Sequence, residues 1–240
     1  MNKTNDGLYD LIIIGASFAG LVAARTAAHR GLKVAIIDAK KEPGARVRTT
    51  GILVKEAADE ADIPSALTRK IAAARLYAPN GMHIDLEAPG YFFLATDTAA
   101  ILRWLAREAA RAGADLLFGA RFTGASRDGD RLRLDGLALS ARYLLGADGA
   151  KSQVAQALGL GRNREFLLGM EIEYEETPTV DPDFIHCFID SHLAPGYLGW
   201  VVPGAGMTQA GPAGAPAPLR RGARPRPPGV LQTHPPPLPP

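Results

Sequence analysis

The sequence predicts an α/β fold in which a parallel sheet with covering helices is interrupted by an inserted antiparallel sheet. Apolar runs alternate with helical patterns in one part of the chain, and short strand-like segments between Pro and Gly turns fill the other. A third observation, the accumulation of proline near the end, predicts a disordered Pro-rich C-terminal tail. The expected division is a discontinuous α/β domain at 1–50 and 95–165, an incomplete antiparallel domain at 51–94 and 166–210, and a tail at 211–240.

The first forty residues have the pattern of one complete βαβ unit. The apolar run 11–14 is short and β-branched enough for a buried parallel strand, and a turn and a helical pattern follow it. Gly31 ends the helix, and residues 34–37 form a second apolar strand that ends on Asp38. A unit with such short connections is typical of a Rossmann-like domain.

The turn at 15–20, GASFAG, is typical of a dinucleotide-binding loop. Gly15 fills the position that needs a tight turn, and Gly20 the position where helix and strand pack closely. Ser17 replaces the middle glycine, but it is small and its hydroxyl can bond a phosphate oxygen. With Phe18 and Ala19 it begins the helix, and a pyrophosphate rests against the N-terminus of that helix in such sites.

Asp38 follows Gly20 by eighteen residues, at the end of the second strand. An acid at this place accepts hydrogen bonds from an adenosine ribose and disfavours the 2′-phosphate of NADP. The alternative interpretation is an ordinary βαβ unit that binds no nucleotide.

Composition excludes several classes of protein. The net charge of +2 over 240 residues predicts neither nucleic-acid binding nor a polybasic membrane surface. Cys187 is the single cysteine, so no intrachain disulfide can form and a reducing compartment is expected. The start of the chain does not suit a signal peptide, and the apolar stretch 11–24 is too short and interrupted to span a bilayer. We therefore expect a cytoplasmic protein with no transmembrane segment, and contact with a membrane surface stays open.

The link after Asp38 and the elements that follow it alternate between polar turns and short regular segments. The link carries Lys40, Lys41, Arg46 and Arg48, for which contact with a cofactor competes with plain solvation as an interpretation. We expect a helix at 54–61, antiparallel strands at 72–94, a capped helix at 99–112, a strand at 114–119 and an antiparallel meander at 121–145.

A second informative turn, GADGA at 146–150, follows the apolar strand that ends at Leu145. Asp148 and Gly149 then lie at the carboxyl end of a parallel strand, where a short acid is well placed for a ligand hydroxyl. The alternative is an Asx-type cap for the helix expected at 152–158.

Residues 166–203 return to strand-like alternation and are expected in a larger antiparallel sheet. His186 and His192 are expected to flank this sheet without a carboxylate or cysteine partner at metal-ligand spacing, and His83 has the alternation of a surface strand residue, so no metal site is predicted. From Gly211 onward no strand or helix pattern is found, and 11 of the 19 prolines lie there. This tail is either a proline-rich docking segment or, as we favour, the product of a GC-rich gene read in a shifted frame.

Together GASFAG, Asp38 and GADGAKSQV resemble motifs of flavoprotein oxidoreductases of the para-hydroxybenzoate hydroxylase fold. Within that group the sequence is most similar to the geranylgeranyl-reductase-like branch, over about residues 9–211. The first motif is shared with many FAD and NAD enzymes, whereas the GADG-A-x-S segment is more specific.

The resemblance implies a Rossmann-like FAD-binding domain with an inserted antiparallel β substrate domain. It implies FAD with its adenosine ribose on Asp38 and with the Asp148-Gly149 turn along its ribityl and pyrophosphate portion. It also places Phe122 near the adenine. NAD(P)H is the implied electron donor, and the implied reaction is flavin-mediated hydride transfer to an unsaturated, isoprenoid-like substrate.

The segment GYLGWVVP is similar to a substrate-sheet segment of the reductase branch. Tyr197 and Trp200 would then form an aromatic wall for a small apolar substrate, although a pair of core aromatics explains them equally well. No residue stands out as a catalytic acid.

The chain also departs from the family pattern. Thr98 stands where the family often has an arginine, and Thr49 occupies the region of a cysteine in archaeal reductases. The third flavin motif, a Gly-Asp before a helix, is absent from the 240 residues, which predicts a C-terminally truncated or frameshifted chain that binds FAD weakly or not at all. Two alternatives therefore accompany the reductase interpretation: an FAD-dependent aromatic monooxygenase, and a non-catalytic remnant with a Pro-rich interaction tail.

Overall fold

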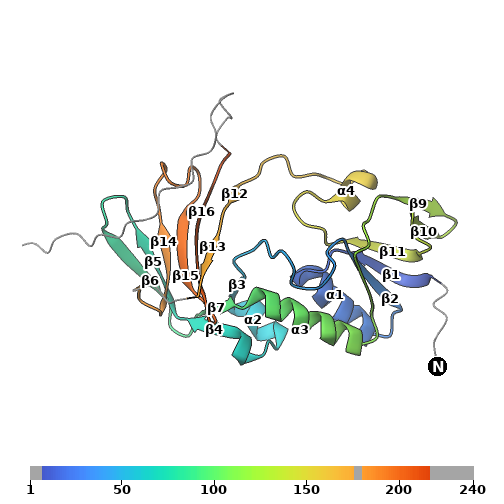
Figure 1. Cartoon of the computed structure of the whole chain (residues 1–240), viewed down its shortest axis with the longest axis horizontal. Coiled ribbons are helices and arrows are strands. Elements are labelled where there is room, and N and C mark those ends of the chain that lie inside the picture. Colours follow the sequence, from blue (N-terminus) through green and yellow to red (C-terminus); the bar gives the residue numbers. More distant parts are fainter. Residues whose placement is uncertain (1–6, 176–179, 217–240) are drawn as a thin grey trace, which may run out of the picture.

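The computed structural model describes residues 7–175 and 180–216, and this part of the chain forms three sheets with helices beside them (Figure 1). A six-stranded, mostly parallel sheet lies at one end of the molecule, and a seven-stranded sheet lies at the other. A three-stranded sheet lies between them along the lower side of the view, as do the helices except the short one at Gln153–Ala157, which lies at the upper right. The mixed α/β architecture expected from the sequence is confirmed.

The parallel sheet is built around the first βαβ unit. Its strand order is β8-β2-β1-β11-β10-β9, and the first four strands are parallel. Their bounds are β1 Leu8–Ile14, β2 Val34–Asp38, β8 Asp115–Phe118, β9 Ala125–Asp128, β10 Arg131–Leu134 and β11 Ser140–Gly146. The expected meander at 121–145 is partly wrong. Its first strand begins only at Ala125, and its strands extend the main sheet because β10 pairs with β11.

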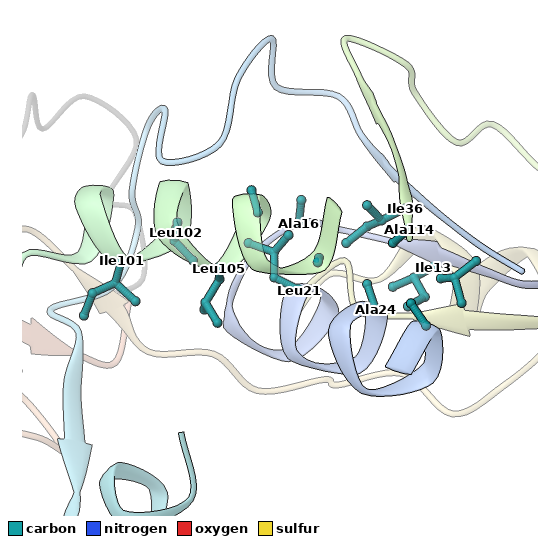
Figure 2. Packing of buried hydrophobic residues seen from close by; sticks show 13 residues of the cluster. Ile13, Ala16, Leu21, Ala24, Ile36, Ile101, Leu102, Leu105 and Ala114 are labelled. Carbon is teal, nitrogen blue, oxygen red and sulfur yellow. The ribbon is translucent and has the colours of Figure 1, made fainter. Parts of the chain in front are cut away.

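Two helices cover one face of this sheet, α1 Phe18–His29 and α3 Thr98–Arg111. Asp97 begins α3, because its carboxylate accepts a hydrogen bond from the amide of Ala100 at 2.9 Å. The apolar side chains of both helices, β1 and β2 form one buried cluster, along which Figure 2 shows Leu105, Leu21 and Ile13. Each such fully buried aliphatic side chain contributes about 1.5–3 kcal/mol relative to exposure, so this cluster holds the helices on the sheet.

The opposite face of the sheet has its own apolar cluster, which includes Phe122, Leu134 and Val154. Val154 belongs to the short helix α4, Gln153–Ala157, which follows the second turn. The sheet is therefore buried on both faces near its centre, as expected for parallel strands.

A three-stranded antiparallel sheet connects the two ends of the molecule. It consists of β3 Ile52–Val54, β7 Phe93–Thr96 and β4 Thr68–Ile71, with α2 Lys55–Ala61 and a 3₁₀ turn at Ser65–Leu67 beside it. The helix expected at 54–61 is confirmed. The strand expected near residue 93 does not join its sequence neighbours β5 and β6, since β7 pairs with β3 and β4 instead.

The strands of the seven-stranded sheet come from two separate parts of the sequence, residues 73–87 and residues 168–214. Its path is β12-β16-β15-β14-β5-β6, with β13 paired to β16. The bounds are β5 Ala73–Tyr77, β6 His83–Glu87, β12 Leu168–Gly169, β13 Ile172–Tyr174, β14 Phe184–Phe188, β15 Gly199–Pro203 and β16 Thr208–Gly214. One pair, β5 with β14, is parallel, which the prediction of a wholly antiparallel sheet missed.

Two expectations about this sheet need correction. Regular structure does not stop at Gly211, because β16 continues through Gly214 and pairs with β15 and β12. His186 does not flank the sheet: it is buried within β14, where its Nδ1 lies 2.9 Å from the Tyr77 hydroxyl and its Nε2 lies 2.8 Å from the Asp181 carbonyl. The remainder of the predicted proline-rich tail, residues 217–240, lies outside the described residues.

Candidate functional site

The two turns that the sequence singles out are in direct contact. Strands β1 and β11 are parallel neighbours with Ile14 opposite Gly146, and the Ala147 amide donates to the Ile14 carbonyl at 2.8 Å. A Cβ atom on Gly15 would lie 2.3 Å from the Ala147 carbonyl oxygen and 3.0 Å from the Asp148 Cα. Two segments about 130 residues apart in sequence thus form one edge, at the carboxyl ends of parallel strands, where ligands bind in α/β sheets.

The glycines of the first turn have the roles that the motif predicts. Gly15 has a φ of +106°, a region that L side chains rarely adopt. Gly20 lies so close to β1 that an added Cβ would come within 1.8 Å of the Gly15 carbonyl oxygen. Both positions therefore require glycine, one for conformation and the other for close approach of helix and strand.

Ser17, Phe18 and Ala19 form the beginning of α1. Ser17 is the N-cap residue, yet its side chain makes no capping hydrogen bond. Phe18 packs partly against the core of the α/β part, and Ala19 is exposed. The first turn of a 12-residue helix therefore faces solvent with its amides and one serine hydroxyl, an arrangement that favours a phosphate.

Asp38 lies against the same turn. It ends β2, is half-buried, and accepts hydrogen bonds from the Ala16 amide at 2.8 Å and the Lys40 amide at 2.7 Å. These bonds hold the carboxylate beside the Gly15 turn. Since each carboxylate oxygen can accept further bonds, the group remains able to receive a ligand hydroxyl.

Asp148 lies at the edge formed by the two turns, and its carboxylate also bonds residues at the start of α4. One carboxylate oxygen accepts from the Ser152 hydroxyl at 2.6 Å, and the other accepts from the Gln153 and Val154 amides at 2.6 and 3.2 Å. The structure thus shows the capping role that was the alternative for this residue. Gly149 is exposed with a φ of +86° and no heavy atom within 4 Å of an added Cβ, so the backbone there is open to a ligand.

Phe122 is a core residue. Its side chain is only 5% exposed and packs in the cluster on the far face of the parallel sheet from α1 and α3. It offers almost no side-chain surface to a ligand, so a contact with adenine would have to come from the backbone around it.

A cavity of about 700 Å³ brings Arg48 and Trp200 together. Its walls come from the link after β2, the beginning of α3 and the edge of the seven-stranded sheet. The Trp200 indole N–H donates to Glu171 at 3.2 Å, which fixes the ring against this wall. Tyr197 does not line the cavity; it lies in the turn before β15 and is 53% exposed. The structure therefore does not bring the two aromatics into one wall.

Several residues that line this cavity were not predicted as site residues from the sequence. They lie at the N-cap of α3, in the link between β12 and β13, on β13, or in the β15–β16 turn: Asp97, Met170, Glu171, Glu173 and Met207. The alternation in EIEYEE was a usable signal, since residues two apart in an extended segment point to the same side and both Glu171 and Glu173 line the cavity. The position of Thr98 is structural: its hydroxyl contacts that of Thr96 at 2.9 Å, which in turn donates to the Gly51 carbonyl.

Neither a metal-ligand cluster nor a membrane-spanning helix is found in the part of the chain that the structure describes. No group of three or more His, Cys, Asp or Glu side chains is placed to hold a metal ion among residues 7–175 and 180–216. Within the same residues no helix is long and apolar enough to cross a bilayer.

The sequence matches known proteins over most of its length. The family described as "FAD binding domain" matches residues 9–213. A digeranylgeranylglycerophospholipid reductase of Methanosarcina acetivorans is 29% identical over 222 residues, covering 85% of this chain and 54% of the relative. A geranylgeranyl diphosphate reductase of Rhodobacter capsulatus is 29% identical over 206 residues, covering 81% and 52%. The chain spans about half the length of these curated relatives.

Solved structures give the same picture. A geranylgeranyl bacteriochlorophyll reductase-like protein from Thermoplasma acidophilum superposes with a TM-score of 0.73 at 27% identity, covering 87% of this chain and 57% of that protein. A probable FAD-dependent monooxygenase from Pseudomonas aeruginosa shares the fold, with a TM-score of 0.67 at 17% identity over 87% of this chain and 61% of its own. Because the family match extends over more than three quarters of the sequence, the chain belongs to the FAD binding domain family of flavin-dependent oxidoreductases.

Proposed function

We propose that FAD binds along the edge formed by the Gly15 and Asp148 turns. The observation that carries this proposal is the contact between those turns, with the Asp38 carboxylate held against them by the Ala16 amide. The adenosine ribose would bond Asp38, and the pyrophosphate would lie on the amides at the start of α1 beside the Ser17 hydroxyl.

The fit of FAD is supported by the glycine positions. A side chain at Gly15 would clash with the Ala147 backbone and push the two turns apart, and one at Gly149 would project into the open edge where the ribityl chain is expected. From there the isoalloxazine would point toward the cavity that contains Arg48 and Trp200. Arg48 is exposed and free to move toward a flavin edge.

We infer that the reaction is hydride transfer from NAD(P)H to an unsaturated, isoprenoid-like substrate. Bound FAD would supply the redox chemistry, and the residues of this chain would bind, orient and shield the reactants. Two features support the substrate class: relatives named as geranylgeranyl reductases, and a cavity wall that combines Trp200 with Met170 and Met207. Flexible methionines beside an aromatic ring suit a long apolar ligand of variable shape.

The first test is the visible spectrum of the purified protein before and after FAD is added, followed by a flavin-fluorescence titration. Asp38→Ala should weaken FAD binding by about 1–3 kcal/mol, roughly 5- to 150-fold, because a polar ligand group loses its partner. Asp10→Ala is the matched control: Asp10 also accepts a backbone amide, from Lys33 at 2.9 Å, but outside the proposed site. A colourless protein that takes up no flavin would contradict the proposal.

The reaction is tested with flavin-loaded protein, NADPH and a geranylgeranyl compound without oxygen. Saturation of the alkene is expected. Peroxide release on aeration, without loss of the alkene, would instead indicate the oxygenase chemistry named above as an alternative.

A further inference from the structure

A second pocket, of about 560 Å³, opens beside the Asp148 turn and shares no lining residue with the cavity of Trp200. It is formed within one segment, 149–166, which folds back on itself through α4 and the loop that follows. Its lining includes Gly149, Lys151, Gln156, Arg162, Arg164 and Phe166.

The pocket carries three positive charges and no negative one. Lys151, Arg162 and Arg164 line it and no carboxylate does; Glu165 is the one acid in the segment 149–166 and is not a lining residue. None of the three cations forms an ion pair with any residue that the structure describes. Three like charges around one hollow repel one another, and an arrangement of this kind is relieved when an anion enters it.

Two contacts connect the parts of the segment that carry the cations. The Asn163 side-chain amide donates to the Ala150 carbonyl at 3.1 Å, and this bond ties the arginine-bearing loop to the turn that carries Lys151. The Lys151 ammonium lies 5.5 Å from the centre of the Phe166 ring, and both residues line the pocket. All three cationic residues are exposed and line the same pocket, so an anion could reach them from solvent.

The geometry points to a binding site for a phosphate ester that carries at least two negative charges. Guanidinium groups bond phosphate oxygens in pairs, and an ammonium adds a third, less directional contact. The Gln156 amide offers a further polar group in the same lining. Since Gly149 belongs both to this pocket and to the proposed flavin edge, the phosphate would lie beside the flavin without being part of it.

Two ligands could supply this phosphate, a nicotinamide dinucleotide or a phosphorylated isoprenoid. Only this choice between sources depends on the function proposed above. Anion binding itself requires neither flavin nor turnover, so the two ideas can fail separately.

The experiment is a calorimetric titration of the full chain with inorganic pyrophosphate, with and without saturating FAD. The double substitution Arg162→Gln and Arg164→Gln should weaken pyrophosphate binding at least tenfold. The matched control is Arg103→Gln with Arg107→Gln, which removes the same charge from the exposed face of α3 and should change binding less than twofold. Circular dichroism of each variant verifies that the fold is kept.

The source is identified by competition. Stronger displacement of pyrophosphate by 2′,5′-ADP than by 5′-AMP would assign the pocket to a nicotinamide dinucleotide phosphate, and stronger displacement by dimethylallyl diphosphate than by either nucleotide would assign it to a prenyl phosphate. Three results would overturn the inference: no pyrophosphate binding by the wild type, equal losses in the pocket and control variants, or loss of the pyrophosphate site when FAD is added. If the pocket variant unfolds, the FAD and competitor arms on the wild type still decide.

Discussion

Replacing Gly20 by alanine tests the close packing that forms the candidate site. Gly20 is buried in the first turn of α1, and its added Cβ would lie 1.8 Å from the Gly15 carbonyl oxygen and 3.4 Å from the Ala147 Cβ. The nearer atom belongs to the backbone, so it cannot rotate away as a side chain would. The helix and β1 would have to separate by about 1.5 Å to restore an ordinary contact.

The expected change in stability combines two opposite effects. Alanine is favoured over glycine inside a helix by about 1 kcal/mol. Overpacking costs about 1–3 kcal/mol even where side chains can adjust, and the upper end applies to a backbone contact. The free energy of unfolding should therefore fall by about 2 kcal/mol. The assay is urea unfolding followed by circular dichroism, with FAD affinity measured in parallel and expected to fall too.

Gly161→Ala is the matched control. No heavy atom lies within 4 Å of its added Cβ, and its φ lies outside the left-handed region. This change should leave the free energy of unfolding unchanged or raise it by up to about 1 kcal/mol, because alanine restricts the unfolded chain. The reasoning is refuted if Gly20→Ala is as stable as the wild type, or if both alanines destabilise equally.

Three further predictions concern single side chains. Asp148→Ala should lower the free energy of unfolding by about 1 kcal/mol in urea titrations, whereas Asp148→Asn, which can still cap α4, should retain most of it. Arg75 bonds Asp85 at 2.6 and 2.8 Å and lowers the pKa of that carboxyl. The difference in free energy of unfolding between the wild type and Asp85→Asn should therefore be present at pH 6 and vanish as the pH falls below about 4. A difference that grows in acid would contradict this. Burial raises the pKa of the Cys187 thiol, so its reaction with a disulfide reagent at pH 8 should be slower in the folded protein than in urea, and equal rates would show that the thiol is open to solvent.

Local signals predicted the α/β part of the molecule well. The run at 11–14, the GASFAG turn and the strand ending on Asp38 appear in the structure as expected, because each is decided by neighbours in sequence. The Asp97 cap of α3 is equally local. Even the meeting of the two turns follows from a rule, since carboxyl ends of parallel strands share one edge.

The alternation of apolar and polar residues does not predict which distant strands pair. Nothing in the alternation of β7 reveals that it joins β3 and β4 rather than the adjacent hairpin. The place of Tyr197 outside the cavity also depends on where a turn projects from the sheet, which periodicity does not encode. The predicted end of regular structure at Gly211 was wrong because it relied on proline content. Pro212 has no amide hydrogen to donate, yet it lies within β16, where its carbonyl accepts a hydrogen bond from the Met170 amide.

The parallel pair β5–β14 has a consequence for how the chain folds. Ala73 lies opposite Phe184, so the middle of the seven-stranded sheet cannot close until more than a hundred further residues have left the ribosome. The hairpin of β5 and β6 is made early and must wait with one edge unpaired, and such an edge invites association with other chains. Synthesis that stalls before β14 should therefore yield aggregates nucleated by the hairpin.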